Sequence, residues 1–298
     1  MKLPNAPATA RVPFFVVEGA GNGASVGASV GAGKRAVGSV AREHLAALRG
    51  WPGMLEVDER SVTLVAADRS AALAEVHAAL RSQGLIRAWR DESFALFDPG
   101  THEVLATMER AAARFWGTLT LGAHANGYVT DGDGDGGDGG GRPVAMWIAR
   151  RAFDKATDPG LFDNLIGGGV PAGQTPQEAL QREGWEEAGL SAACIAAAVP
   201  AGVLRLHRDV PEGCQLEDLH VFDLALPPTL LPHNQDGEVA DFRLLPVAEA
   251  LALAAGSSAL GAMTVDAALV TLDFGRRHGL LAGAAARAMA AALFTPAV

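Results

Sequence analysis

Three glutamates and one arginine fall within six residues, Glu183, Glu186, Glu187 and Arg182, in the stretch QREGWEEAGL. On a helix, residues three and four apart share a face, so the three carboxylates would crowd one patch. Carboxylates at that spacing repel one another unless a cation lies between them. Magnesium is a hard cation that prefers oxygen ligands. The pattern therefore indicates a metal site on a helix, with Arg182 reducing the repulsion when no metal is bound.

The residues around this cluster mark both ends of the helix. Thr175 is the expected N-cap, Pro176 occupies the first helical position, and Glu178 completes a T-x-x-E capping box. Gly189 is placed to end the helix. The glycines at 167–169 would let the backbone approach a ligand closely. An acidic helix face by itself is usually only solvated, and these flanking signals favour a site instead.

The pattern of the first 115 residues predicts a small α+β domain. Apolar alternation and turn signals predict its strands, and amphipathic spacing predicts its helices, one of them with Ser70 as N-cap. We expect strands over 12–18, 61–66 and 88–98, and helices over 41–50, 70–84 and 102–117.

Residues 116–298 predict a second domain, in which a mixed sheet is covered by helices on both faces. Its fold class is therefore α/β. We expect strands over 119–132, 142–152, 201–210, 219–227 and 241–245, and helices over 175–189, 246–255 and 264–279. A hairpin turn is expected over PEGCQLED, and the alanine-rich segment near the C-terminus is expected to be a packed helix.

Composition and charge limit the classes of partner. With 298 residues and nearly half of them apolar, the chain can bury a full-sized core. The net charge of −10 argues against a nucleic-acid partner, which usually requires a basic surface. Cys194 and Cys214 have no paired spacing, so neither a disulfide framework nor a zinc site is indicated. We expect a small-molecule partner, no membrane partner and a cytoplasmic location, with a homodimer left open.

Two glycine-rich stretches imitate known binding loops, and both fail at a required position. GAGNGASVGASVGAGKR has Ala28 where a P-loop needs glycine, and Arg35 where it needs the hydroxyl that holds magnesium. DGDGDGGDGGGR has Arg142 where a calcium loop has its bidentate glutamate. We therefore interpret the first as a loose loop and the second as a hairpin tip.

The region after residue 167 resembles the Nudix box. The matching residues are Gly168, Arg182-Glu183, Glu186-Glu187 and Gly189-Leu190, with departures at Gln174, where the family has glutamate, and at Gly184, where it has an aliphatic residue. The resemblance implies a Nudix α/β/α sandwich with a mixed sheet and hydrolysis of a diphosphate linkage with Mg²⁺ or Mn²⁺. It further implies that Glu183, Glu186 and Glu187 bind metal with a carbonyl of Gly167, and that Arg182 orients a carboxylate.

Physical chemistry supports this resemblance independently. A diphosphate repels an incoming nucleophile until cations neutralise its charge, and a rigid helical triplet of carboxylates can hold those cations. Glu238, in DGEVADF, is a candidate for a further ligand or base, and a solvated turn residue is the alternative. Glu217, expected in the hairpin turn, is a weaker substitute. His124 and Asn126 are expected to be structural hydrogen-bonding residues.

Other motifs resemble one branch of the family, the Nudix portion attached to some fungal thiamine pyrophosphokinases and stand-alone relatives with the same N-terminal domain. These motifs are ERAAARFWG with GAHANGYV, then KATDPGLFDNLIGGGVPAG and ALVTLDFGRRHGL. The resemblance implies hydrolysis of thiamine diphosphate, preferentially its oxidised forms, to the monophosphate and phosphate. Trp89, Arg90 and Glu92 would suit a flat cationic thiamine ring, although a tryptophan at a strand end is more often part of the core.

Three alternatives remain open. The enzyme could act on nucleotide sugars or other nucleoside diphosphate derivatives, using the same metals. It could be a Nudix-fold module that binds a diphosphate without cleaving it, a view that the neutral Gln174 favours and the complete Glu186-Glu187 pair opposes. The isomerase that shares this fold is less favoured, since neither cysteine is placed as a catalytic thiol.

Overall fold

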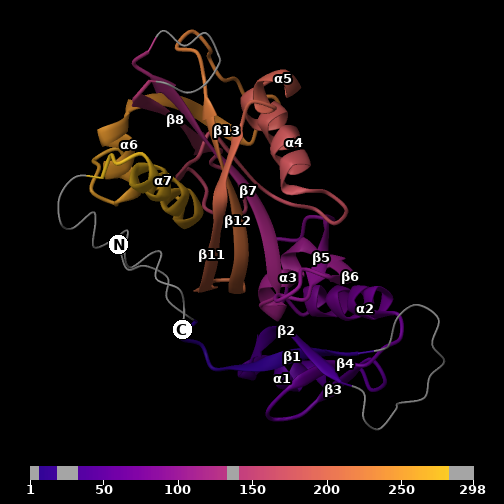
Figure 1. Ribbon diagram of the computed structural model, residues 1–298. Helices are drawn as coiled ribbons and strands as arrows, with labels where there is room; N and C mark the ends of the chain where they lie inside the picture. Colours follow the sequence, from indigo (N-terminus) through magenta and orange to yellow (C-terminus); the bar gives the residue numbers. More distant parts are fainter. Residues whose placement is uncertain (1–6, 19–32, 133–140, 282–298) are drawn as a thin grey trace.

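The computed structural model describes residues 7–18, 33–132 and 141–281 (Figure 1). Most of the first glycine-rich stretch, most of the aspartate-glycine loop and the alanine-rich C-terminal segment lie outside these ranges, and so do the predictions made for them. Among the described residues, no helix is long and apolar enough to cross a membrane.

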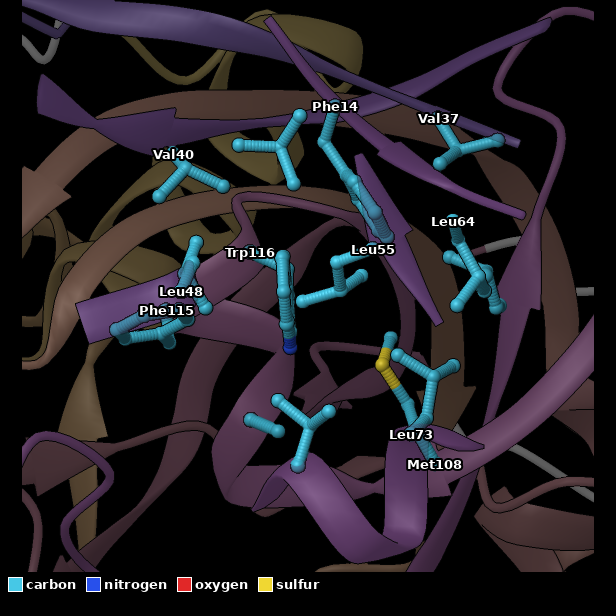
Figure 2. Close-up of a cluster of buried hydrophobic side chains, with 14 of the residues drawn as sticks. Phe14, Val37, Val40, Leu48, Leu55, Leu64, Leu73, Met108, Phe115 and Trp116 are labelled. Atoms are coloured by element: carbon cyan, nitrogen blue, oxygen red, sulfur yellow. The ribbon is translucent and has the colours of Figure 1, made fainter. Parts of the chain in front are cut away.

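The N-terminal unit is built on a four-stranded sheet in the order β2-β1-β4-β3. Strand β1 pairs antiparallel with β2 and parallel with β4, and β3 pairs antiparallel with β4. Phe14 of β1 stacks on Trp116, with ring centroids 4.4 Å apart, in the middle of the apolar cluster shown in Figure 2. The elements are β1 (Arg11–Val17), β2 (Lys34–Ala41), η1 (Arg42–His44), α1 (Leu45–Leu48), β3 (Leu55–Val57), β4 (Val62–Leu64), α2 (Arg69–Ser82), β5 (Ser93–Phe97), β6 (Val104–Glu109) and α3 (Arg110–Trp116).

The helix expected over 102–117 is only half correct. Its first part is strand β6, which pairs antiparallel with β5, and only α3 is helical. Ala106 and Met108 are buried at alternate positions of this strand. Pairing with β5 therefore places the apolar side chains of β6 together on one buried face of the two-stranded sheet. Glu109 caps α3 by accepting a hydrogen bond from the backbone of Ala111. The N-cap of α2 is likewise Asp68 and not Ser70.

His77 of α2 is fully buried and accepts a hydrogen bond from Nε1 of Trp116 at 2.7 Å. Burial lowers the pKa of His77 from 6.5 to about 3. The unfolded chain therefore binds a proton at this residue below about pH 6.5, whereas the folded protein does not until near pH 3. Since the unfolded state binds more protons in this window, stability falls as the pH falls through it.

We expect this residue to contribute about 1.4 kcal/mol to the loss of stability between pH 7.5 and pH 5.5. His77→Gln keeps an acceptor for Trp116 but does not titrate, so its unfolding free energy should depend less on pH by that amount. Urea unfolding of both proteins at the two pH values measures the difference. An equal decline in both proteins would contradict a buried neutral histidine.

The C-terminal unit contains a mixed sheet in the order β11-β12-β7-β8-β13. Strand β7 runs parallel to β12 and antiparallel to β8, while β10 pairs with β7 and β9 with β8. Helices α4 and α5 lie on one face, and α6 and α7 on the other (Figure 1). The predicted α/β sandwich with an N-terminal α+β unit is thereby confirmed. The elements are β7 (Leu119–Thr130), β8 (Pro143–Arg151), β9 (Phe162–Asp163), β10 (Ile166–Gly169), α4 (Pro176–Ala188), α5 (Ala192–Ile195), β11 (Val199–Val210), β12 (Gly213–Ala225), β13 (Val239–Pro246), α6 (Val247–Ala254) and α7 (Val265–Arg277).

The predicted hairpin turn over PEGCQLED is wrong in its extent. Strands β11 and β12 pair as far as Val210 and Gly213, so only Pro211 and Glu212 form the turn. Glu217 therefore lies within β12, where its side chain is buried and only 8% exposed. Cys214 and Leu219 are also buried in this strand, which explains why it continues through a stretch rich in polar residues.

Candidate active site

Helix α4 begins and ends where its sequence signals predict. The hydroxyl of Thr175 accepts a hydrogen bond from the backbone of Glu178 at 3.2 Å, and the Glu178 carboxylate accepts one from the backbone of Thr175 at 2.7 Å. Pro176 occupies the first turn, and Gly189 ends the helix in a left-handed conformation, with φ of 65°. These caps satisfy backbone groups that would otherwise lack partners, so the helix is a rigid support for its acidic face.

Arg182 holds two of the three glutamates of α4. Its guanidinium donates to Oε1 of Glu183 at 2.8 Å and to Oε2 of Glu186 at 2.9 Å. Burial lowers the pKa of Arg182, but the two adjacent carboxylates outweigh this effect, so its pKa is raised overall. The arginine therefore remains charged and offsets the repulsion within the cluster.

Glu187 is the most deeply buried of the three and is 7% exposed. Its Oε2 accepts a hydrogen bond from the backbone of Gly167 at 3.0 Å. Burial and the nearby charge of Glu183 raise the pKa of Glu187 well above its usual value, and this one hydrogen bond does not compensate. Burial also raises the pKa of Glu183 despite its contact with Arg182. Two buried carboxylates thus lie together with too little positive charge, as expected of a cation site.

The glycines before α4 make room for side chains from other elements. A Cβ atom at Gly168 would lie 2.3 Å from the carboxyl carbon of Glu183. At Gly169 it would lie 2.6 Å from the ring of Phe94, which comes from the N-terminal unit. These close approaches allow β10 to lie between the acidic face of α4 and strand β5.

The donor atoms fit a hard divalent cation in their chemistry. All the side-chain donors of this face are carboxylate oxygens, the ligands that magnesium and manganese prefer. Among the residues that the structure describes, however, no three acidic, histidine or cysteine side chains converge closely enough to hold a metal ion. The contacts with Arg182 explain this, because they turn Glu183 and Glu186 toward the guanidinium.

A cavity of about 850 Å³ opens beside this face and is lined by both units. It brings together nearly all the residues singled out in the sequence. From the C-terminal unit these are Gly167, Arg182, Glu183, Glu186, Glu187 and Glu238, and from the N-terminal unit Arg90 and Glu92. Glu92 accepts a hydrogen bond from Arg110 at 2.8 Å.

Trp89 does not line this cavity, so the expected trio is divided. Its Nε1 donates to Asp91 at 2.7 Å, and the guanidinium of Arg81 lies over its ring, 4.5 Å from the centroid. The remaining surface of Trp89 packs against the core of the N-terminal unit. Because Arg81 and Asp91 already occupy its ring face and its N–H, we expect Trp89 to stabilise the N-terminal unit rather than to contact the substrate.

We expect Trp89→Ala to leave the Michaelis constant for diphosphates unchanged within about twofold. The unfolding free energy should instead fall by about 1–2 kcal/mol, because the ring is only partly buried. Steady-state kinetics and urea unfolding on the same preparation separate these effects. A rise in the Michaelis constant limited to thiamine-type substrates would restore a recognition role.

Glu238 lines the cavity, and its Oε2 forms an ion pair with the ammonium group of Lys155. Burial would raise the pKa of Glu238, but the contact with Lys155 and the nearby arginines lower it overall. Gln174 lies outside the cavity lining, and its buried Oε1 has no hydrogen-bond partner among the described residues. This amide oxygen therefore accepts no hydrogen bond from Arg182.

The cavity also contains a group of acidic residues that the sequence did not mark as part of the site or marked only weakly, namely Asp163, Glu217 and Asp266. Glu217 accepts a hydrogen bond from Gln215 at 2.6 Å, and Gln215 also donates to Asp266 at 3.1 Å. Asp163 is bonded to Arg151 at 3.0 Å. The alternation of Gln215 and Glu217 on one face of a strand was an available signal, but it was hidden by the expected hairpin turn.

Comparison with known proteins gives the family of each unit. Residues 122–264 match the NUDIX domain, and residues 29–120 match a domain of unknown function, DUF4743. The chain contains a Nudix domain. The acidic face of α4 and the glycine-rich strand β10 before it both lie within the residues that match this domain.

Two plant proteins are similar over most of this chain. The Arabidopsis thaliana protein named Nudix hydrolase 20, chloroplastic, is 36% identical over 215 residues, which are 72% of this chain and 54% of the relative. Nudix hydrolase 24, chloroplastic, from the same plant is 35% identical over 72% of this chain and 55% of the relative. The chain thus spans about half the length of these relatives. The solved structure of DR0079 from Deinococcus radiodurans, 23% identical, covers 60% of this chain and 97% of its own, with a TM-score of 0.44.

Proposed function

We propose that this protein is a divalent-metal-dependent pyrophosphohydrolase that cleaves a diphosphate linkage in the cavity beside α4. The observation that carries the proposal is the pair of buried carboxylates, Glu183 and Glu187, which share one face of a capped helix with little compensating charge. A binding surface for a neutral ligand would have no use for this costly arrangement. The Nudix domain assignment supports the same chemistry.

In this proposal the metal is held by Glu183, Glu186 and Glu187, with the carbonyl of Gly167 and, as a further candidate, Glu238. When bound, Mg²⁺ or Mn²⁺ neutralises the diphosphate so that water can attack it.

The other residues position these groups. Arg182 orients Glu183 and Glu186 and keeps the face intact before the metal binds. Glu238 is the candidate to accept a proton from water at Oε1, because Lys155 occupies its Oε2.

We further propose thiamine diphosphate, and its oxidised forms in particular, as the substrate, with the monophosphate and phosphate as products. The support is the resemblance of motifs in both units to the thiamine-related branch, and it does not depend on Trp89. Nucleotide sugars and other nucleoside diphosphate derivatives are the alternative substrates, because the metal site itself does not distinguish one organic group from another.

A phosphate-release screen tests both levels of the proposal. The protein would be assayed with Mg²⁺ and with Mn²⁺ on thiamine diphosphate, its oxo and oxy analogues, ADP-ribose, nucleotide sugars and dinucleoside polyphosphates. We expect metal-dependent turnover that is fastest on the oxidised thiamine forms. Turnover of nucleotide derivatives alone would remove the thiamine assignment. No turnover of any diphosphate would favour a module that binds a diphosphate without cleaving it.

A further inference from the structure

The cationic side chains that line the cavity differ in how they are paired. In the C-terminal unit, every one of them contacts an acidic side chain, which neutralises it locally. The pairs are Arg151 with Asp163, Lys155 with Glu238, Arg182 with Glu183 and Glu186, and Arg208 with Asp266. Each of these cations is already engaged with a carboxylate of the site.

The N-terminal unit contributes four arginines to the same cavity, and among the described residues only Arg110 forms an ion pair, with Glu92. Within the described ranges, no acidic side chain lies within ion-pair distance of Arg87, Arg90 or Arg114. We call these three residues the arginine patch. Among the described residues, these are the cationic side chains of the cavity lining that form no direct ion pair.

Arg90 is the best-defined member of the arginine patch. Within the described part of the chain, its guanidinium donates one long hydrogen bond, 3.5 Å from the hydroxyl of Thr157 across the boundary between the units. Burial lowers the pKa of Arg90 and the nearby Arg110 lowers it further, while the carboxylates of Glu238 and Glu92, beyond ion-pair distance, offset only part of this. A half-buried guanidinium without an acidic contact costs stability, and a bound anion would recover that cost.

The backbone around Arg90 is held in an unusual conformation. Ala88 and Asp91, on either side of it, have φ of 54° and 57°, a left-handed region that alanine rarely adopts. The backbone N–H of Arg90 donates to Glu109 at 3.0 Å, which fixes this segment against α3. Strain of this kind is retained where the surrounding structure must aim a side chain, and it occurs most often at functional sites.

Arg114 approaches the same cavity from α3. It follows Arg110 by four residues, so both lie on one face of the helix. The turn of the β11-β12 hairpin packs closely here, since a Cβ atom at Gly213 would lie 2.2 Å from the carbonyl oxygen of Arg114. Arg90 and Arg114 are therefore positioned by separate segments of the N-terminal unit, one strained and one helical, and Arg114 lies next to a hairpin of the other unit.

We propose that Arg90 and Arg114, with the exposed Arg87, bind a phosphate group of the substrate directly, so that the N-terminal unit completes the binding site. This inference rests on the proposed function, because it assigns the diphosphate to the same cavity. Guanidinium groups match phosphate oxygens through paired hydrogen bonds. For a thiamine-type diphosphate, a phosphate and not the cationic ring would then face the N-terminal unit.

Binding of inorganic pyrophosphate and of inorganic phosphate to the full chain in EDTA tests the arginine patch without turnover or metal. Isothermal titration would compare the wild type with the double variant Arg90→Gln, Arg114→Gln. We expect pyrophosphate affinity to fall at least about tenfold, because each hydrogen bond between charged groups contributes about 1.5–3 kcal/mol. Phosphate should lose affinity in the same direction. No pyrophosphate binding by the wild type, or equal binding by both proteins, would overturn the inference.

Arg81→Gln is the matched control, because Arg81 belongs to the same unit but lies over Trp89 and outside the cavity lining. It should bind pyrophosphate like the wild type, and a matching loss in this control would overturn the assignment. Arg90→Lys keeps the charge but not the paired geometry, so it should bind with intermediate affinity. A folded Arg90→Lys protein with wild-type affinity would show that paired hydrogen bonding by Arg90 is not involved.

Kinetics distinguish the failure of this inference from the failure of the proposed function. If diphosphates are hydrolysed but the double variant keeps the wild-type Michaelis constant, the arginine patch is not a subsite while the function stands. If no diphosphate is hydrolysed but pyrophosphate binding depends on Arg90 and Arg114, the subsite stands and the hydrolase proposal fails.

Discussion

Glu187→Gln is expected to lower turnover of any diphosphate substrate by at least about a hundredfold, a typical loss for one electrostatic contact of an active site. The carboxyl group is buried beside Glu183 and is the most deeply buried acidic group on the face of α4, where a bound cation would favour its ionised form. Glutamine has nearly the same shape and retains an oxygen that can accept the hydrogen bond from Gly167. The substitution therefore removes charge while leaving the packing in place.

Steady-state turnover over a series of magnesium concentrations measures this effect. Glu178→Gln is the matched control, because it makes the same chemical change on the same helix but outside the cavity. Glutamine also serves in a capping box, so this control should fold and turn over like the wild type. Near-normal turnover of Glu187→Gln at limiting magnesium would mean that the acidic face is only a helix surface.

Gly168→Ala is expected to lower turnover by about a hundredfold, because the added methyl group would displace the carboxylate of Glu183. The added methyl group would lie 2.3 Å from the carboxyl carbon of Glu183, so that carboxylate must move by about 1 Å to restore normal contact. A displacement of about 1 Å at an active site can cost about a hundredfold in rate. Gly168 does not have a positive φ, so alanine meets no backbone strain there.

Turnover and the melting temperature would be measured together for this variant. Gly50→Ala provides the comparison, since a Cβ atom at Gly50 meets nothing within 4 Å and its φ is not positive. We expect both variants to stay folded and only Gly168→Ala to lose activity. Full activity of Gly168→Ala would show that the position of Glu183 is not critical.

Local signals account for what the sequence predicted well. Helix α4 was predicted to the residue because Thr175, Glu178 and Gly189 satisfy its end groups within a few positions of the chain. The strands β7, β8 and β13 were also recognisable from apolar runs. In contrast, β6 was mistaken for a helix because its alternation is short and lies directly before α3, and pairing with β5 decided its conformation. The short strands β9 and β10 have no pattern of their own and form by pairing with β8 and β7.

Gly184, where the Nudix box has an aliphatic residue, is a further position that local signals did not explain and tertiary packing did. The sequence marked it only as an exception to the Nudix box, whereas the structure shows that a Cβ atom there would lie 2.6 Å from Ile195 and 2.9 Å from Ile166. Side chains from α5 and β10 occupy the space that an aliphatic residue would fill. A distant part of the chain therefore decided this position, and no local rule could have predicted it.

By itself, the sequence determined the acidic helix, its caps and the type of chemistry, because carboxylate spacing on a helix depends only on helical geometry. Only the tertiary structure decided which other side chains share the cavity. It placed Arg90 and Arg114 beside the Nudix face, removed Trp89 from it and moved Glu217 into a buried strand. These outcomes depend on contacts between residues far apart in the chain, where packing and pairing, rather than local propensity, determine the position of a side chain.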